Sequence, residues 1–255
     1  MPVEIITVPC LSDNYAYVLL DTDMGTAAVV DVPEAGPINA VLAAHNARLT
    51  TVLITHHHSD HIAGTADLTG VAEAEIIGAA ADAHRLPPLT QKVAEGDNLT
   101  VLGKTCRVFD VSGHTLGHVA FYFPTLKHVF TADSLMALGC GRLFEGAPGQ
   151  MWDSLLKLRA LPNDTVVCSG HEYTQSNAKF ARSVDPDNTA LQARAAEIDR
   201  LRAANKPTVP SLLGVEKQTN PFLLADDPRV MRAVNMADAT PAEVFAEVRK
   251  RKDIF

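Results

Sequence analysis

Short apolar segments rich in β-branched residues alternate with turns over the first two thirds of the chain. Such runs have the length and composition of buried strands. The predicted strands are 4–8, 15–20, 27–32, 51–55, 75–77, 105–111, 119–123, 128–132 and 165–168. Helical spacing fits 37–45, with Pro37 in the first turn, and 151–161, which Pro162 ends. This part of the chain is therefore expected to form sheets covered by helices.

The pattern becomes mostly helical after Tyr173. Helical spacing predicts helices at 174–184, 189–204 and 241–252, and proline-containing loops at 185–187 and 205–207 separate them. No internal repeat and no low-complexity segment interrupts either part. We therefore expect one α/β domain over residues 1–172 and a mostly helical domain over residues 173–255.

Composition is that of an ordinary globular protein. The 255 residues are 47% hydrophobic and 20% charged, which excludes disordered and fibrous classes. No apolar run approaches the roughly 18–20 residues that span a bilayer. The first ten residues lack the basic and apolar regions of a secretory signal. A cytoplasmic protein is expected.

The net charge of −8 is unevenly distributed. Acidic and basic residues balance from Asp185 onward, so the excess negative charge lies before that residue. Nonspecific nucleic-acid binding needs a cationic face and is therefore not expected. Two bound dications would offset much of the negative charge.

The four cysteines are scattered and form no CxxC pair. A chain of this size does not depend on disulfides, so we expect reduced thiols in the core. Cys140 lies between two glycines and is the remaining candidate for a reactive thiol.

A cluster of histidines follows the predicted strand 51–55 directly. Imidazole and carboxylate are the usual ligands of zinc, iron and manganese, and alternate side chains of a loop point to the same side. His56 and His58 are thus expected to face one metal ion. Asp60 and His61, one turn later, can face a second position.

Two metal ions need more ligands than this loop provides. Three further predicted strands each end close to such a residue, namely His114, Asp133 and His171. Ligands at the ends of neighbouring strands converge at one edge of a sheet. Gly113, Gly117 and Gly170 would allow the tight turns that bring the side chains inward. The alternative is a solvated histidine loop with incidental polar residues elsewhere.

The other five histidines lie outside this set. His45, His84 and His128 have no motif around them and are predicted to lie at the surface. His57 alternates away from the metal positions and is expected to point outward or to bond nearby. His118 either supports a ligand or is purely structural.

The spacing at His56, His58, Asp60 and His61 is the HxHxDH signature of the metallo-β-lactamase superfamily. Within that superfamily the chain resembles the glyoxalase II (hydroxyacylglutathione hydrolase) family. The resemblance is carried by residues 7–15, 113–118, 139–142, 170–174 and 219–223. It implies a four-layer αββα sandwich followed by a helical substrate-binding domain.

The resemblance also implies a ligand set. One metal ion would be held by His56, His58 and His114, and the other by Asp60, His61 and His171. Asp133 would bridge the two ions together with a water or hydroxide, which attacks the substrate carbonyl. Asp60 would act either as a ligand alone or also as a proton relay. Zinc is the expected metal, with iron and manganese as alternatives.

The substrate implied by the resemblance is an S-(2-hydroxyacyl)glutathione thioester, and S-D-lactoylglutathione is the expected one. The matching substrate-binding positions are Arg142, Phe144, Tyr173, Arg249 and Lys252. Arg142 stands where many relatives have lysine, and Phe144 where some have tyrosine, so reach and hydrogen bonding differ. The basic end of the last helix could clamp the anionic substrate or merely complement the helix dipole.

Three other functions share part of this pattern. A persulfide dioxygenase of the same superfamily would use one iron, so metal content distinguishes it. A lactonase or β-lactamase would not need the Gly-His-Glu-Tyr segment or the helical tail. A noncatalytic metal-binding protein would not need an exchangeable water between two ions. A monomer is the expected oligomeric state.

Overall fold

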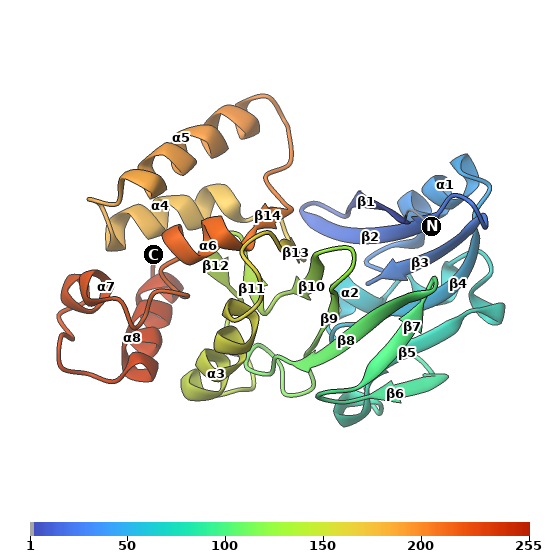
Figure 1. The fold of residues 1–255 in the computed structure, drawn as a ribbon, viewed down its shortest axis with the longest axis horizontal. Helices are drawn as coiled ribbons and strands as arrows, with labels where there is room; N and C mark the ends of the chain where they lie inside the picture. Colours follow the sequence, from blue (N-terminus) through green and yellow to red (C-terminus); the bar gives the residue numbers. More distant parts are fainter. Residues whose placement is uncertain (1–2) are drawn as a thin grey trace. The chain divides into compact units, whose positions relative to one another are not determined.

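Alternating apolar segments of the first part of the chain form two sheets, as the computed structural model, which describes residues 3–255, shows (Figure 1). The described residues fall into two compact units, and each is treated by itself below. The first unit extends to Asp110 and includes Thr115–Thr131, and the second comprises Val111–His114 and Ala132–Phe255.

The first unit contains most of the strands. Its elements are β1 (Val3–Cys10), β2 (Asn14–Asp21), β3 (Thr26–Val30), α1 (Ala35–Ala44), β4 (Arg48–Leu53), α2 (Ser59–Ile62), β5 (Glu75–Ala79), β6 (Gln91–Val93), β7 (Asn98–Val101), β8 (Lys104–Asp110), β9 (Val119–Phe123) and β10 (His128–Ala132), with short 3-10 helices at Thr65–Asp67, Val71–Glu73 and Ala80–Asp82.

The first sheet has the strand order β1-β2-β3-β4-β5-β6. β1, β2 and β3 are antiparallel, whereas β3, β4, β5 and β6 are parallel. A parallel pair needs a long crossover, and α1 provides it between β3 and β4. The carboxyl ends of β3 and β4 therefore lie at the same edge of the sheet.

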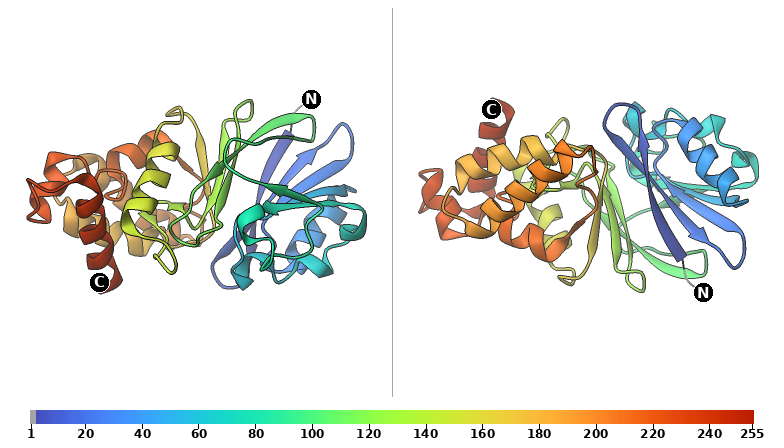
Figure 2. Two further views of the ribbon diagram at one scale, coloured as in Figure 1. Left: turned by 90° about the horizontal axis from the view of Figure 1, so that it is seen from below. Right: turned by 90° about the horizontal axis from the view of Figure 1, so that it is seen from above.

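Strand β2 is buried along its whole length because both of its faces are covered. On one face Val18 packs in a cluster with Ile38 of α1, and Figure 2 shows this helix along the sheet. On the other face the Tyr17 ring meets Phe130 of β10 edge to face at 5.4 Å. In this unit β10, β9, β8 and β7 follow one another as antiparallel neighbours, so two sheets pack face to face.

The second unit is mostly helical. Its elements are β11 (Leu135–Met136), β12 (Gly139–Cys140), α3 (Pro148–Arg159), β13 (Val166–Ser169), α4 (Thr174–Val184), α5 (Thr189–Ala203), β14 (Ser211–Leu212), α6 (Leu213–Thr219), α7 (Pro228–Ala233) and α8 (Pro241–Asp253). Helices α4 and α5 lie side by side (Figure 2) and bury Ala178, Ala181, Leu191 and Ala195 together with Leu138.

Helix α8 has a sharply defined start. The side chain of Thr240 accepts a hydrogen bond from the backbone N–H of Glu243, and the Glu243 side chain bonds back to the N–H of Thr240. Pro241 occupies the first helical turn, where its missing N–H is not needed.

The α/β class with a helical C-terminal region is confirmed. The strands 119–123 and 128–132 and the helix 174–184 have the predicted bounds, and the other predicted elements differ by a few residues at their ends. The structure adds elements that were not predicted, notably β6, β7, α6, α7 and the β11–β12 hairpin. Within residues 3–255, no helix is long and apolar enough to cross a membrane.

Candidate metal centre

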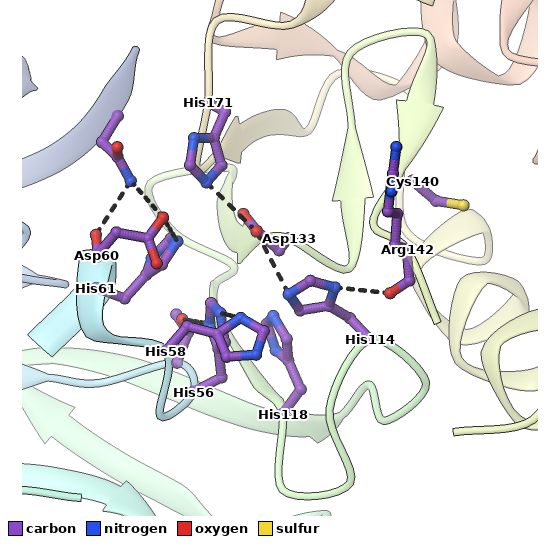
Figure 3. A network of polar contacts seen from close by, with 12 residues as sticks. His56, His58, Asp60, His61, His114, His118, Asp133, Cys140, Arg142 and His171 are labelled. Carbon is purple, nitrogen blue, oxygen red and sulfur yellow. Dashed lines mark hydrogen bonds and ion pairs between the residues drawn. The ribbon is translucent and has the colours of Figure 1, made fainter. Parts of the chain in front are cut away.

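The histidine loop begins directly after β4, and its ligand-type side chains gather at the carboxyl edge of the first sheet. His56 and His61 are fully buried. Nε2 of His56 lies 3.1 Å from Nδ1 of His58, and the rings of His56 and His61 are 4.2 Å apart between centroids. Figure 3 shows these three imidazoles facing one another with Asp60 beside them.

Neighbouring hydrogen bonds determine which nitrogen of each buried ring is available. The Thr55 hydroxyl donates to Oδ2 of Asp31 and so accepts from Nδ1 of His56, at 3.0 Å. The same Oδ2 of Asp31 lies 2.8 Å from Nδ1 of His61 and accepts its proton. Because both Nδ1 atoms carry the proton, Nε2 is the ring nitrogen of His56 and of His61 whose lone pair can bind a cation.

Asp60 lies in the first turn of α2. The Nδ2 group of Asn14 donates to the backbone oxygen of Asp60 at 3.0 Å and to its Oδ2 at 3.1 Å. That carboxylate oxygen is 3.9 Å from Nε2 of His61. Asn14 therefore orients the carboxylate toward the buried imidazole.

Two other histidines of this unit, His57 and His118, lie next to the cluster of His56, His58 and His61. Nδ1 of His57 lies 3.2 Å from Oδ2 of the buried Asp82, which confirms the prediction that His57 turns away and bonds nearby. His118 is fully buried, and its ring stacks on His56 at 4.5 Å with an angle of 10° between the planes. His118 thus packs against a ligand-type ring and restricts its rotation.

In the second unit, one carboxylate oxygen lies between two imidazoles. Oδ2 of Asp133 is 3.4 Å from Nε2 of His114 and 3.4 Å from Nε2 of His171, as Figure 3 shows. All three side chains are buried. Nδ1 of His114 donates to the backbone oxygen of Arg142 at 2.7 Å, so its Nε2 lone pair faces Asp133.

Two glycines allow this close approach. Gly113 has φ +147°, a conformation that side chains rarely adopt, and a Cβ there would lie 2.6 Å from Met151. A Cβ on Gly141 would lie 2.2 Å from the backbone oxygen of Asp133 and 2.7 Å from Nδ1 of His114. Both positions therefore exclude any larger residue.

The donor geometry of each unit fits divalent cations. Metal–ligand bonds of about 2.0–2.1 Å in a tetrahedral site place neighbouring donors about 3.3–3.4 Å apart. The separation of 3.1 Å at His56 and His58 and the two of 3.4 Å at Asp133 are close to that value. Nitrogen and oxygen donors in such sets suit zinc, iron and manganese.

The sequence-predicted substrate-binding residues all lie in the second unit, and three of them are exposed. The side chains of Arg142 and Phe144 are each 64% exposed and Tyr173 is 41% exposed. The ring of Tyr173 stacks on His171 at 4.6 Å with 6° between the planes, and Phe144 meets the His114 ring at 5.3 Å. Tyr173 and Phe144 therefore adjoin the predicted ligands of this unit.

The two remaining cations lie on α8. Arg249 is only 5% exposed, and its guanidinium donates to the backbone oxygen of Cys140 at 2.9 Å and pairs with Asp253 at 2.9 Å. Lys252 Nζ lies over the rings of Phe180 and Phe255. Burial, and then the charges of Arg249 and Arg142, lower the Lys252 pKa to about 8, against the opposing effect of Asp253.

All four cysteines are buried and free. Burial raises the pKa of Cys10 and of Cys140 to about 11, and it raises those of Cys106 and Cys168 as well. The thiols are therefore protonated near neutral pH, as expected for core residues. Cys140 is not an exposed nucleophile.

Three histidines without a motif were predicted to lie at the surface, and the prediction holds for two of them. His45 and His84 are exposed, as predicted. The surface prediction for His128 was wrong, because its ring is half-buried with Nδ1 2.6 Å from the Leu126 oxygen. That burial lowers the pKa of His128.

Sequence reasoning missed the residues that orient the predicted ligands, namely Asn14, Asp31 and Thr55. A signal for Asp31 exists, since it is an acidic residue directly after a strand that is parallel to β4. Such a position shares the sheet edge with the histidine loop. Asn14 begins β2, and nothing in its local pattern marks it.

Comparison with known families divides the chain into two matched segments. Residues 13–171 match the model of the metallo-beta-lactamase superfamily. Residues 172–255 match the model described as the hydroxyacylglutathione hydrolase C-terminus.

Curated relatives are similar over the whole chain. A hydroxyacylglutathione hydrolase of Ruegeria pomeroyi is 63% identical over 255 residues, which is the full length of both chains. One of Cereibacter sphaeroides is 57% identical, again over the full length of both.

Solved structures of lower identity share the fold. The BLEG-1 B3 metallo-beta-lactamase has a TM-score of 0.67 at 21% identity and covers 86% of this chain and 99% of its own. ETHE1 from Myxococcus xanthus has a TM-score of 0.64 at 22% identity, over 100% of this chain and 99% of its own. At these identities the likeness concerns the fold alone.

Proposed function

We propose that this chain, which belongs to the hydroxyacylglutathione hydrolase family within the metallo-β-lactamase superfamily, hydrolyses S-(2-hydroxyacyl)glutathione thioesters. S-D-lactoylglutathione is the proposed substrate, with D-lactate and glutathione as products. The observation that carries the proposal is the 63% identity over full length to a hydroxyacylglutathione hydrolase. The donor geometry within each unit supports it.

The proposed cofactor is a pair of divalent cations, most simply zinc, although iron and manganese accept the same donors. His56, His58 and His114 would hold one ion, and Asp60, His61 and His171 the other. When bound, such ions lower the pKa of water to about 7 and polarise a carbonyl. The chain then needs no separate basic residue to generate a nucleophile.

Asp133 is the proposed bridging ligand. Its Oδ2 lies equally far from two imidazoles that are assigned to different ions, which supports a shared oxygen. The buried carboxylate would hold the two ions at a fixed separation and neutralise part of their charge. Through the ions that it would hold, Asp133 would help to position the nucleophile relative to the thioester carbonyl.

Besides binding a metal ion, Asp60 is a candidate proton relay. Its side chain is 40% exposed, so its carboxylate can exchange protons with solvent. We propose that Asp60 binds the second ion and is held in place by Asn14. Departure of the product needs no acid from the chain, because a thiol with a pKa near 8.5 leaves readily as a thiolate.

Glutathione is anionic, and the cations near α8 are its proposed binding partners. The charges that interact here are three cations, Arg142, Arg249 and Lys252, and one carboxylate, that of Asp253, so positive charge is in excess. Arg142 and Lys252 would contact carboxylates of the peptide directly. The buried Arg249 would contribute its charge and support Cys140. Tyr173 and Phe144 would pack against the remainder of the thioester.

The functional division is proposed to fall between residues 172 and 173. Residues 1–172 would form the catalytic domain and residues 173–255 the substrate-binding domain. The change of family model at residues 171 and 172 supports this boundary. We further propose a cytoplasmic monomer, in keeping with four buried free thiols, whose partner is the thioester and neither nucleic acid nor membrane.

The alternative is a persulfide dioxygenase that uses one iron. The high identity to hydroxyacylglutathione hydrolases over full length favours the thioester hydrolase. Metal analysis separates the two, because the dioxygenase has no use for the donors of a second ion.

The decisive test is steady-state hydrolysis of S-D-lactoylglutathione by the wild type, by metal-stripped protein and by Asp133→Ala. We expect two metal ions per wild-type chain, loss of hydrolysis on stripping, and recovery on adding zinc, iron or manganese. Asp133→Ala should hold fewer ions and lose activity. Asp153→Ala, at an exposed position of α3, is the matched control and should behave as wild type. Activity that survives both stripping and Asp133→Ala would overturn the mechanism.

A further inference from the structure

The β11–β12 hairpin connects two parts of the candidate metal centre. It begins after Asp133 and ends at Gly141 and Arg142. Its strands pair Leu135 with Cys140 and Met136 with Gly139. Every residue from Leu135 to Cys140 is buried, so its backbone groups cannot be satisfied by bulk water.

Side chains of two helical segments, α4 and α6, bind this backbone instead. Asn177 of α4 donates to the oxygen of Ala137 at 3.1 Å. Asn220, at the end of α6, donates to the oxygens of Met136 at 3.1 Å and Gly139 at 3.0 Å. The hairpin is therefore held by amide side chains that lie 40 or more residues later in the sequence.

Charged residues add to these contacts, and one of them is Arg249, which donates to the backbone oxygen of Cys140. The carboxylate of Glu216 accepts from the backbone N–H of Leu138 at 2.9 Å and from Nδ2 of Asn220 at 3.2 Å. Glu216 is fully buried, and its charge is balanced by Arg194 of α5. Because charge-assisted hydrogen bonds in a buried site are directional and strong, this group fixes both the turn and the orientation of the Asn220 amide.

The two ends of the hairpin bear directly on the predicted ligands. The N–H of Gly141 donates to the backbone oxygen of Asp133 at 2.9 Å. The next residue, Arg142, supplies the oxygen that holds Nδ1 of His114. A displacement of the hairpin would thus move the Asp133 carboxylate and release the His114 ring at the same time.

We propose that Asn220, oriented by Glu216, is a positioning residue that holds the β11–β12 hairpin and thereby sets the Asp133 and His114 donors. The helical segment thus determines metal binding in addition to its proposed role in glutathione binding. This inference rests on the proposed function, since it takes Asp133 and His114 as ligands. It gives a chemical role to the Asn-Pro-Phe-Leu segment, which the catalytic proposal leaves unused.

The test compares Asn220→Ala with Asn188→Ala in the full-length protein. Asn188 is likewise buried in the helical segment, but it caps α5, and its side-chain hydrogen bonds are with Asp185, Gln218 and Leu191 and not with the hairpin. Zinc release to a chromophoric chelator, kcat and KM for S-D-lactoylglutathione, and thermal unfolding are measured on both. For Asn220→Ala we expect zinc affinity and kcat to fall by about 10- to 100-fold with KM nearly unchanged. Asn188→Ala should lose thermal stability alone.

A second variant protects the test against failed folding. Asn177→Ala removes one bond to the hairpin at a helical position where alanine is favourable, and it should weaken zinc retention in the same direction. Zinc affinity and kcat at wild-type values in both hairpin variants, or the same zinc loss in Asn188→Ala, would overturn the inference. A wild type that binds no zinc would instead refute the proposed function, so the two failures are distinguishable.

Discussion

The carboxylate of Asp31 lies 2.8 Å from Nδ1 of His61, so a residue at the end of β3 orients a ring that follows β4. Asp31 also accepts from the backbone N–H of Thr55 at 2.8 Å. Its φ of +56° lies in the left-handed region, which Asp and Asn tolerate better than other side chains. The chain leaves β3 in a bend that points this carboxylate at the histidine loop.

Asp31→Asn should reverse the hydrogen bond to His61. The amide oxygen can still accept from the backbone N–H of Thr55, but the NH₂ group would take the place of Oδ2. It would then face the Thr55 hydroxyl and Nδ1 of His61 and place the His61 proton on Nε2. We expect metal affinity and kcat to fall by about 10- to 100-fold. The measurement is metal content after dialysis against graded chelator. Because Asn tolerates the same backbone conformation, thermal unfolding should change little, and unchanged metal retention would contradict this role.

Gly141→Ala should disrupt the donors of the second unit. A Cβ at Gly141 would collide with the backbone oxygen of Asp133 and with the His114 ring, and neither can move without displacing a ligand. Activity with S-D-lactoylglutathione should fall by at least about 100-fold, together with metal content. Gly149→Ala is the control, because its Cβ would meet nothing within 4 Å and it lies in α3. That change should keep activity and should not lower thermal stability.

Substrate affinity should decrease as pH rises through about 8. Burial and the neighbouring Arg249 and Arg142 charges lower the pKa of Lys252 to about 8. Lys252 is therefore charged below that pH and increasingly neutral above it. KM should rise by up to about tenfold per pH unit above this value, with kcat less affected. Lys252→Arg keeps its charge, so its KM should not rise in this range, and it also corrects for ionisation of the substrate.

The same pKa shift has an opposite consequence for stability. An unfolded Lys252 would keep its ordinary pKa near 10.5. Between about pH 8 and that value the unfolded chain binds more protons than the folded chain, so the contribution of Lys252 to the free energy of unfolding increases as pH rises.

The KM prediction for Lys252 has a clear contrary outcome. Identical KM profiles for wild type and Lys252→Arg would show that Lys252 does not titrate against the substrate.

Thiol-directed reagents should leave hydrolysis unchanged. The four cysteines are buried, and burial keeps them protonated near neutral pH. Native protein should therefore react with less than one equivalent of iodoacetamide at pH 7.5, whereas unfolded protein should react at all four positions. Mass spectrometry of the alkylated protein gives the count. Inactivation that parallels modification of Cys140 would contradict this assignment.

The long elements and the principal ligand candidates followed from the sequence because their signals are local. The helix 174–184 and the strands 119–123 and 128–132 have clear periodicity and agree with the observed bounds. The histidine spacing after β4 likewise placed His56, His58 and His61 together. The donors Asp133, His114 and His171 also meet, since each follows a strand end.

The supporting contacts could not be predicted in the same way. The hairpin strands β11 and β12 are two residues long, too short for any period, and their partners Asn177 and Asn220 are distant in sequence. Asn14 acts through tertiary contacts that leave no local pattern, whereas Asp31 is marked only by its place directly after a strand parallel to β4. Arg249 is different, because it follows Phe245 by one helical turn on the buried face of α8, so its burial was foreseeable.

The capping box at Thr240 fixes the residue at which α8 begins, and with it the side of the helix on which each later residue lies. Each helical residue turns the next side chain by about 100°. The direction in which Lys252 points is therefore set a dozen positions earlier by where Thr240 and Glu243 meet. Lengthening the helix by one residue would swing the terminal ammonium around the axis while leaving every side chain chemically intact.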